Sequence, residues 1–151
     1  MRFTLPLILA AIAAPGRPAT AQIAVTPVRD LAFGPVIVGV PTYIPPSHPV
    51  RSGEFRVIGP SGAKVQVRFT LPNQLDGPAG ASLPINFANN DAFHVGTGPG
   101  SVPATFNPKA TRNIQLTGGD VLVFIGGTVS PAGNQPQGNY ASTITLTINV
   151  Q

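Results

Sequence analysis

The sequence predicts an all-β protein: a single immunoglobulin-like, antiparallel β-sandwich of about eight or nine strands. Two observations support this fold class. Glycine and proline account for 35 of the 151 residues, and they separate apolar stretches at intervals of about ten residues, as turns separate the strands of a sandwich. After residue 21 no capped segment repeats its apolar residues every three to four positions, so we expect very little helix.

The clearest strand is the last one in the chain. Ile144, Leu146, Ile148 and Val150 alternate with polar residues, so one face of the strand is apolar and the other is polar. Burial of four aliphatic side chains contributes about 6–12 kcal/mol, at about 1.5–3 kcal/mol each. We therefore expect this strand to close the core.

Other strands are predicted from shorter patterns. The segment Pro35–Val40 alternates like a strand, whereas Pro41–Pro49 is too rich in proline for a ladder and is expected to be an extended surface connection. Proline is tolerated in an edge strand, as at Pro27. The remaining predicted strands are Ile23–Val28, Glu54–Ile58, Val65–Leu71, Leu83–Phe87, Ala92–Val95, Asn113–Leu116 and Val121–Val129.

Residues 1–21 have the pattern of a cleaved Sec-type signal peptide. Arg2 precedes an apolar run from Phe3 to Ala14, and Ala19-Thr20-Ala21 is a small-x-small cleavage site. We therefore expect one β-sandwich domain over residues 22–151, exported to the periplasm, the cell surface or the medium. A retained membrane anchor is the less favoured alternative, because the apolar run is too short to span a bilayer. No later segment is long and apolar enough to do so.

Charge and cysteine content narrow the class of protein. Without residues 1–21, seven basic and five acidic residues leave a net charge of +2, and the basic residues are scattered singly, so nucleic-acid binding is not expected. Charged residues are 9% of the chain, against about 25% in typical domains. This scarcity fits a polymer subunit whose surface is covered by neighbours. Since there is no cysteine, the core alone must stabilise the fold.

Four segments stand out by their order and spacing. They are Leu31-Ala32-Phe33-Gly34 with Val36 and Gly39, Gly53–Gly59, Ile125–Val129, and Gly138-Asn139-Tyr140. Together they resemble the secreted bacterial proteins grouped as domain of unknown function 4402, and the resemblance covers nearly all of residues 22–151. It implies a pilin-like or coat-like β-sandwich at the cell surface, and it carries no enzymatic activity over to this chain.

The end of the chain also resembles that of pilins assembled by a chaperone and an usher. Those pilins have a glycine where this chain has Gly138, followed by alternating apolar residues; Val150 stands where their pattern has Tyr or Phe. The resemblance implies a sandwich completed by a strand from the next subunit. It also implies that the partners are copies of this chain and a periplasmic assembly chaperone.

The donor strand for such an assembly is ambiguous in the sequence. Only the segment Gln22–Val28, with Ile23 and Val25 as its alternating apolar pair, precedes Arg29. This segment is either an ordinary first strand or a donor for a neighbour. The candidate assembly residues are therefore Ile23, Val25, Ile144, Leu146, Ile148 and Val150.

No pattern of residues indicates an enzyme, a cofactor site or a metal site. His48 and His94 are isolated, and the five acidic residues are far apart, so neither zinc, calcium nor glycosidase chemistry is expected. No nucleophile elbow surrounds a serine, and the glycines of 96–100 lack the lysine of a phosphate-binding loop. We therefore favour a structural surface subunit.

The alternative is a monomeric binding module of carbohydrate or adhesin type. It requires exposed aromatic side chains on one loop-rich face. The candidates for such a face are Tyr43, Phe87, Phe93, Phe106 and Tyr140.

Overall fold

The computed structural model describes residues 22–151, so the predicted signal peptide lies outside the described residues. The all-β fold is confirmed, and no helix in this part of the chain could cross a membrane. The expected eight or nine strands are an underestimate, because four of the twelve strands have three residues and are too short to show alternation. The strands are β1 (Ala24–Arg29), β2 (Thr42–Ile44), β3 (Gly53–Ile58), β4 (Lys64–Thr70), β5 (Gln74–Asp76), β6 (Ser82–Asn86), β7 (Ala92–Gly96), β8 (Ala104–Phe106), β9 (Arg112–Gln115), β10 (Asp120–Ile125), β11 (Gly127–Val129) and β12 (Thr145–Val150).

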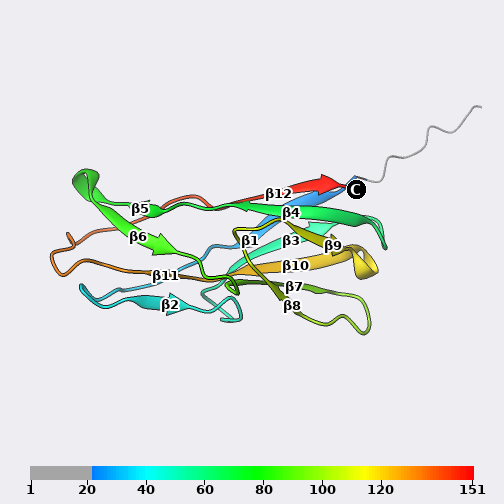
Figure 1. Cartoon of the computed structure of the whole chain (residues 1–151), viewed down its shortest axis with the longest axis horizontal. Helices are drawn as coiled ribbons and strands as arrows, with labels where there is room; N and C mark the ends of the chain where they lie inside the picture. The colour runs from blue at the N-terminus through cyan, green and yellow to red at the C-terminus, as the bar shows by residue number, and fades with distance from the viewer. Residues whose placement is uncertain (1–21) are drawn as a thin grey trace, which may run out of the picture.

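The strands form three antiparallel sheets. The sheet β1-β3-β10-β7-β8 and the sheet β12-β4-β9 are the two layers of a sandwich, and most strands run along the long axis of the molecule (Figure 1). The third sheet, β2-β11-β6-β5, lies at the end of the molecule opposite the C-terminus (Figure 1). It joins the layers, because β5 follows β4 of one layer and β11 follows β10 of the other.

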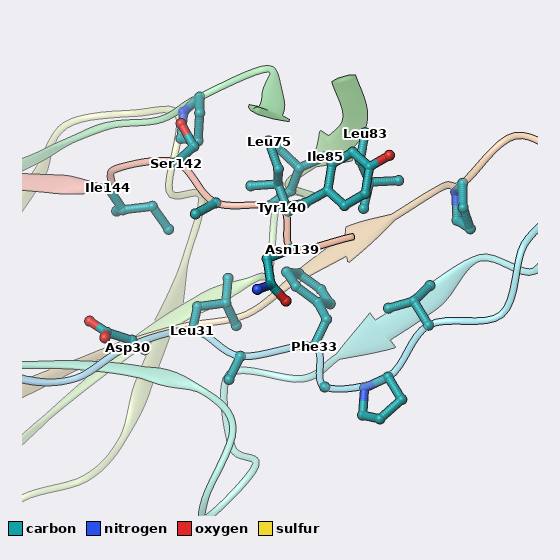
Figure 2. A pocket seen from close by; sticks show the side chains of 18 of the residues that line it. Asp30, Leu31, Phe33, Leu75, Leu83, Ile85, Asn139, Tyr140, Ser142 and Ile144 are labelled. Atoms are coloured by element: carbon teal, nitrogen blue, oxygen red, sulfur yellow. The ribbon is translucent and has the colours of Figure 1, made fainter. Parts of the chain in front are cut away.

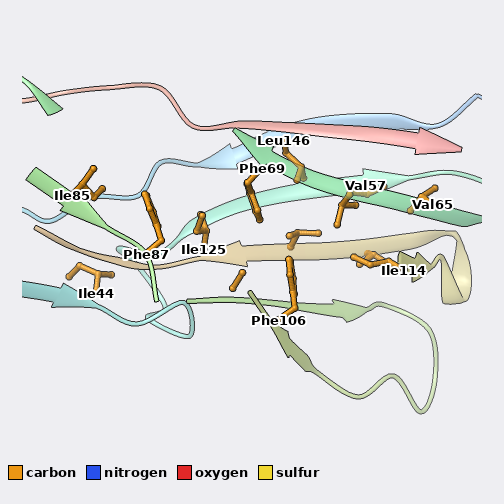
Figure 3. Close-up of a cluster of buried hydrophobic side chains, with 14 of the residues drawn as sticks. Ile44, Val57, Val65, Phe69, Ile85, Phe87, Phe106, Ile114, Ile125 and Leu146 are labelled. Carbon is orange, nitrogen blue, oxygen red and sulfur yellow. The ribbon is translucent and has the colours of Figure 1, made fainter. Parts of the chain in front are cut away.

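The core fills the space between the layers. In β4 the inward residues Val65, Val67 and Phe69 are buried, as the alternation predicts, and in β10 every second residue from Val121 to Ile125 is buried. Phe69 links the layers, since its ring centroid lies 5.8 Å from that of Phe55 and 6.3 Å from that of Phe106. Figure 3 shows Phe69 and Phe106 pointing toward each other across the core. Burying such side chains is the main source of stability in a fold without disulfides.

Two of the predicted segments differ in the structure. Pro35–Val40 is not a strand, because Gly34 before it and Gly39 within it adopt φ values of 70° and 74° and turn the chain. The segment Pro41–Pro49 is not entirely a connection, since it contains β2 at a sheet edge, where no second ladder has to form. The remaining predicted strands correspond to β1, β3, β4, β6, β7, β9 and the β10–β11 pair.

The first and last strands lie on the same side of the sandwich. The link of residues 107–111 joins the edge strands β8 and β9, which places those two edges on one side. Strands β1 and β12 are the opposite edges of the same two sheets, so they lie on the other side. In addition, β1 begins and β12 ends at the same end of the molecule (Figure 1). The open side of the sandwich is therefore bounded by β1 and β12.

Candidate functional site

Strand β12 is the unprotected sheet edge of the described residues. Natural proteins guard edge strands with prolines, charges, bulges or short lengths. Strand β1 has a proline and a register shift, β9 begins with an arginine, and β2, β5 and β8 have three residues each. Strand β12 has six residues in regular register and contains no proline and no charge. Its free edge is thus competent to pair with another strand.

The register of β12 shows which peptide groups are available. The N–H of Gln151 donates to the carbonyl oxygen of Lys64 at 3.1 Å, which makes this pair a hydrogen-bonded pair of the ladder with β4. Antiparallel pairs alternate, so the N–H and C=O groups of Leu146, Ile148 and Val150 point away from β4. The N–H and C=O groups of every second residue of β12 are therefore unpaired at the free edge of the sheet.

A groove of about 1110 Å³ lies at the start of this edge, because its lining ends at Ile144, the residue before β12. One wall is the chain that leaves β1 (residues 30–38), and the other is the chain that enters β12 (residues 135–144). Figure 2 shows Leu31 and Phe33 on the first wall, Asn139, Tyr140 and Ile144 on the second, and Leu75, Leu83 and Ile85 behind them. The groove is bordered by two segments of main chain and floored by apolar side chains, a combination that suits a bound peptide.

The two walls are fixed by specific contacts. The N–H of Ala141 donates to the carbonyl oxygen of Asp76 at 3.0 Å, and the N–H of Asp76 donates back at 2.9 Å, so the second wall is tied to β5. Just outside the groove the two segments approach each other, because a Cβ on Gly39 would lie 3.8 Å from the Cα of Gly133.

The candidate assembly residues of the last strand occupy different positions. Leu146 is 8% exposed and belongs to the core, whereas Ile144 and Ile148 are half-buried at its margin. Ile144 precedes β12 and lines the groove. Val150 is 68% exposed, so the expectation that all four aliphatic residues close the core is wrong: the strand is a sheet edge, and Val150 is its last residue.

Ile23 and Val25 lie in their own chain's sandwich. Val25 pairs with Val57 in the antiparallel ladder between β1 and β3, and both Ile23 and Val25 are half-buried against the core. In this structure the segment Gln22–Val28 is therefore an intrachain edge strand, and a shift of register follows Pro27.

Arg29 anchors the end of β1. Its Nε donates to the carbonyl oxygen of Ser52 at 2.8 Å, and its Nη2 lies 3.0 Å from a carboxylate oxygen of Glu54. Its other amino group donates to the carbonyl oxygen of Pro49 at 2.8 Å. The chain is thus firmly held at Arg29, immediately after the register shift.

The histidines serve the fold in different ways. Nδ1 of His48 accepts N–H groups from Val50 and Arg51, which closes a turn. His94 points into the sandwich from β7, and burial, together with the positive charge of Arg112, lowers its pKa. Within residues 22–151, no three His, Cys, Asp or Glu side chains are grouped so that they could hold a metal ion.

The five aromatic candidates do not gather on one face. Phe87 and Phe106 are buried in the core, and Phe93 stacks on Phe124 at 4.6 Å. Tyr140 lies in the groove, and Tyr43 donates its hydroxyl to the buried carboxylate of Asp91 at 3.1 Å. Burial and this carboxylate raise the pKa of Tyr43.

Sequence reasoning did not predict the groove. Its two walls come from segments about one hundred residues apart, and its floor comes from β5, β6 and β10. The only signal in the sequence that involves both walls is the family resemblance, because two of its motifs, Leu31-Ala32-Phe33-Gly34 and Gly138-Asn139-Tyr140, lie in these segments. Comparison of the chain with models of known protein families and with curated proteins found no match.

Proposed function

We propose that this chain is a non-enzymatic structural subunit of a bacterial surface assembly, pilin-like or coat-like, that joins its neighbours by strand complementation. One observation carries the proposal: the unprotected edge of β12 begins where the wall of an apolar groove ends, at Ile144. A strand added to this edge forms main-chain hydrogen bonds with the outward peptide groups, and the part of it that extends past Ile144 enters the groove. A periplasmic chaperone that covers the same edge before assembly belongs to this proposal.

The donor that we assign is the segment Gln22–Val28 of a second copy of the chain. It has seven residues, against six in β12, and neither segment carries a charged side chain. Ile23 and Val25 supply apolar side chains at alternate positions, as an edge beside an apolar groove requires. The donor and the acceptor thus match in length, charge and periodicity.

The donor can leave its own sheet at a defined place. Strand β1 pairs on one side only, contains Pro27, and shifts register before Arg29, leaving Val28 exposed. Arg29 stays bonded to Ser52 and Glu54, so a change of direction at Val28 frees the preceding residues. Such an exchange of an identical element between copies is domain swapping, and a head-to-tail exchange that does not close produces a filament.

Prolines on β12 test the acceptor edge. The N–H of Ile148 and that of Val150 face away from β4, so Ile148→Pro and Val150→Pro remove donors from the free edge and not from the intrachain ladder. We expect both variants to remain folded monomers. Thr147→Lys is the matched control: it places a charge on the exposed polar face of the same strand and should leave assembly intact.

The readout is negative-stain microscopy of the purified assembly, with unboiled and boiled denaturing gels. The wild-type chain should give filaments or a detergent-resistant ladder, and Thr147→Lys should do the same. Assembly of Ile148→Pro and Val150→Pro at the wild-type level would contradict the role of β12.

A deletion tests the donor separately. Removal of residues 22–28 takes away the donor and keeps β12, so the shortened chain should bind the intact chain without polymerising by itself. Unchanged polymers of the shortened chain would contradict the assignment of the donor.

The binding-module alternative requires exposed aromatic side chains on one face. Its candidate aromatic residues are dispersed or buried, so we do not favour it.

A further inference from the structure

A short loop beside the groove exposes apolar side chains to solvent. The loop Pro35–Val38, here called the flap, lines the groove, yet Ile37 is 70% exposed and Val38 is 48% exposed. Large apolar side chains grouped on a loop mark a surface that another molecule covers. Nothing in the chain's own described residues covers them, although the groove lies next to them.

Each end of the flap is a glycine that acts as a pivot. Gly34 and Gly39 have φ values of 70° and 74°. Gly39 is the third residue of a turn in which the N–H of Val40 donates to the carbonyl oxygen of Ile37 at 3.1 Å, and a type II turn requires a positive φ at that position. Loop closures in proteins are absorbed by a few such residues.

The chain outside the two pivots is held in place. Before Gly34, Phe33 is buried, and its carbonyl oxygen accepts a hydrogen bond from Arg51 at 3.3 Å. After Gly39, the chain enters β2 at Thr42, which pairs with β11. The chain is thus held at Phe33 and at Thr42, and the flap with its two glycines lies between these points. A Cβ on Gly39 would lie 3.8 Å from the Cα of Gly133, two residues before the opposite wall begins, so this wall is the surface toward which the flap closes.

We propose that the flap closes over the donor strand when a second copy of this chain fills the groove. Ile37 and Val38 then become contact residues of the acceptor site, and they cover the side of the donor that faces away from the groove floor. This inference rests on the proposed function, because it takes residues 22–28 of the neighbour as the occupant.

The test uses a fluorescent synthetic peptide with the sequence of residues 22–28, added to the folded chain of residues 22–151. Ile37→Ser and Val38→Ser should each weaken peptide binding by about tenfold, since each variant loses the burial of an aliphatic side chain. Val102→Ser is the matched control. Val102 is 77% exposed in the loop between β7 and β8 and does not line the groove. The Val102→Ser variant should therefore bind the peptide with the affinity of the wild-type chain.

Hydrogen exchange of residues 34–40 provides a second readout, and it should slow when the peptide binds. Ile148→Pro should abolish binding, which locates the peptide at β12 and not at the β3 edge. Wild-type affinity in both flap variants, with unchanged exchange at 34–40, would overturn the flap and leave the proposed function standing. Failure of the wild-type chain to bind the peptide would contradict the proposed function, and it would also contradict the role of the flap, which depends on that function.

Discussion

The ring of Tyr140 lies directly against Gly77, at the turn that follows β5. A Cβ on Gly77 would lie 2.2 Å from Cε1 of the tyrosine ring. The hydroxyl of Tyr140 donates to the carbonyl oxygen of Pro136 at 2.7 Å and accepts a hydrogen bond from Gln135 at 2.8 Å. Tyr140 thus fixes the chain that enters β12 and, with it, one wall of the groove.

Gly77→Ala should destabilise the protein. The added methyl group has no room beside Tyr140, and an overpacked site costs about 1–3 kcal/mol. Urea unfolding of the variant measures the loss. The matched control is Gly133→Ala, because a Cβ on Gly133 meets open space, and an unstrained surface change stays within about 0.5 kcal/mol. Equal stability of the two variants would contradict the close contact of Tyr140 with Gly77.

Asp91 should be a major stabilising residue although its carboxylate is buried. Its two carboxylate oxygens accept hydrogen bonds from the Tyr43 hydroxyl at 3.1 Å and from the N–H of Ala88 at 2.7 Å. Asp91→Ala leaves a backbone donor without its acceptor and should cost about 1.5–3 kcal/mol of unfolding free energy, and Tyr43→Phe should cost only about 0.5–1.5 kcal/mol. A chemical denaturation series measures both. A larger loss for Tyr43→Phe than for Asp91→Ala would contradict this ranking.

The same contact predicts a spectroscopic signature. Burial and the Asp91 carboxylate raise the pKa of Tyr43, so this phenol should ionise above the ordinary tyrosine value of about 10. Asp91→Asn removes the negative charge and should bring the titration closer to that value. Ultraviolet absorbance at increasing pH follows the ionisation, and an identical titration in both proteins would contradict the coupling.

Stability should fall in mild acid because of His94. Its Nε2 is buried without a hydrogen-bond partner, as is Nε of Arg112, and burial together with the charge of Arg112 lowers the pKa of His94. Below the unfolded pKa of about 6.5, the unfolded chain therefore binds this proton more readily than the folded chain does. The contribution of neutral His94 to the free energy of unfolding is therefore fully present above that pH and is lost as the pH falls.

Denaturation at several values from about pH 7 to pH 5 tests the role of this histidine. His94→Gln should flatten the pH dependence, and Arg112→Gln should reduce it, because the neighbouring positive charge is removed. A wild-type slope in His94→Gln would show that other groups cause the acid sensitivity.

Local patterns predicted the regular part of the fold. The alternation in Val65–Leu71 and in Val121–Ile125 reflects strands with one face on the core, and these became β4 and β10. The same rule failed at Pro35–Val40, where Gly34 before the segment and Gly39 within it turn the chain and leave the alternating valines in a loop. Periodicity reports which residues can share a face and does not report whether another layer covers this face.

The candidate site could be predicted only in part. The pattern of β12 revealed an uncharged, proline-free strand, but its position at a sheet edge and the exposure of Val150 depend on the pairing with β4 alone. The groove depends on the approach of residues 30–38 to residues 135–144, for which no local pattern exists. The sequence left open whether Gln22–Val28 is an intrachain strand, and the structure places it in β1.

The measurement that tests the central claim most directly is residue-resolved amide exchange along β12, in the monomer and in the assembled protein. In the monomer, the amides of Thr145, Thr147 and Asn149, which face β4, should exchange slowly, and those of Leu146, Ile148 and Val150 should exchange quickly. Assembly should protect the second set to the level of the first. Fast exchange of Leu146, Ile148 and Val150 in the assembled protein would contradict strand addition at β12.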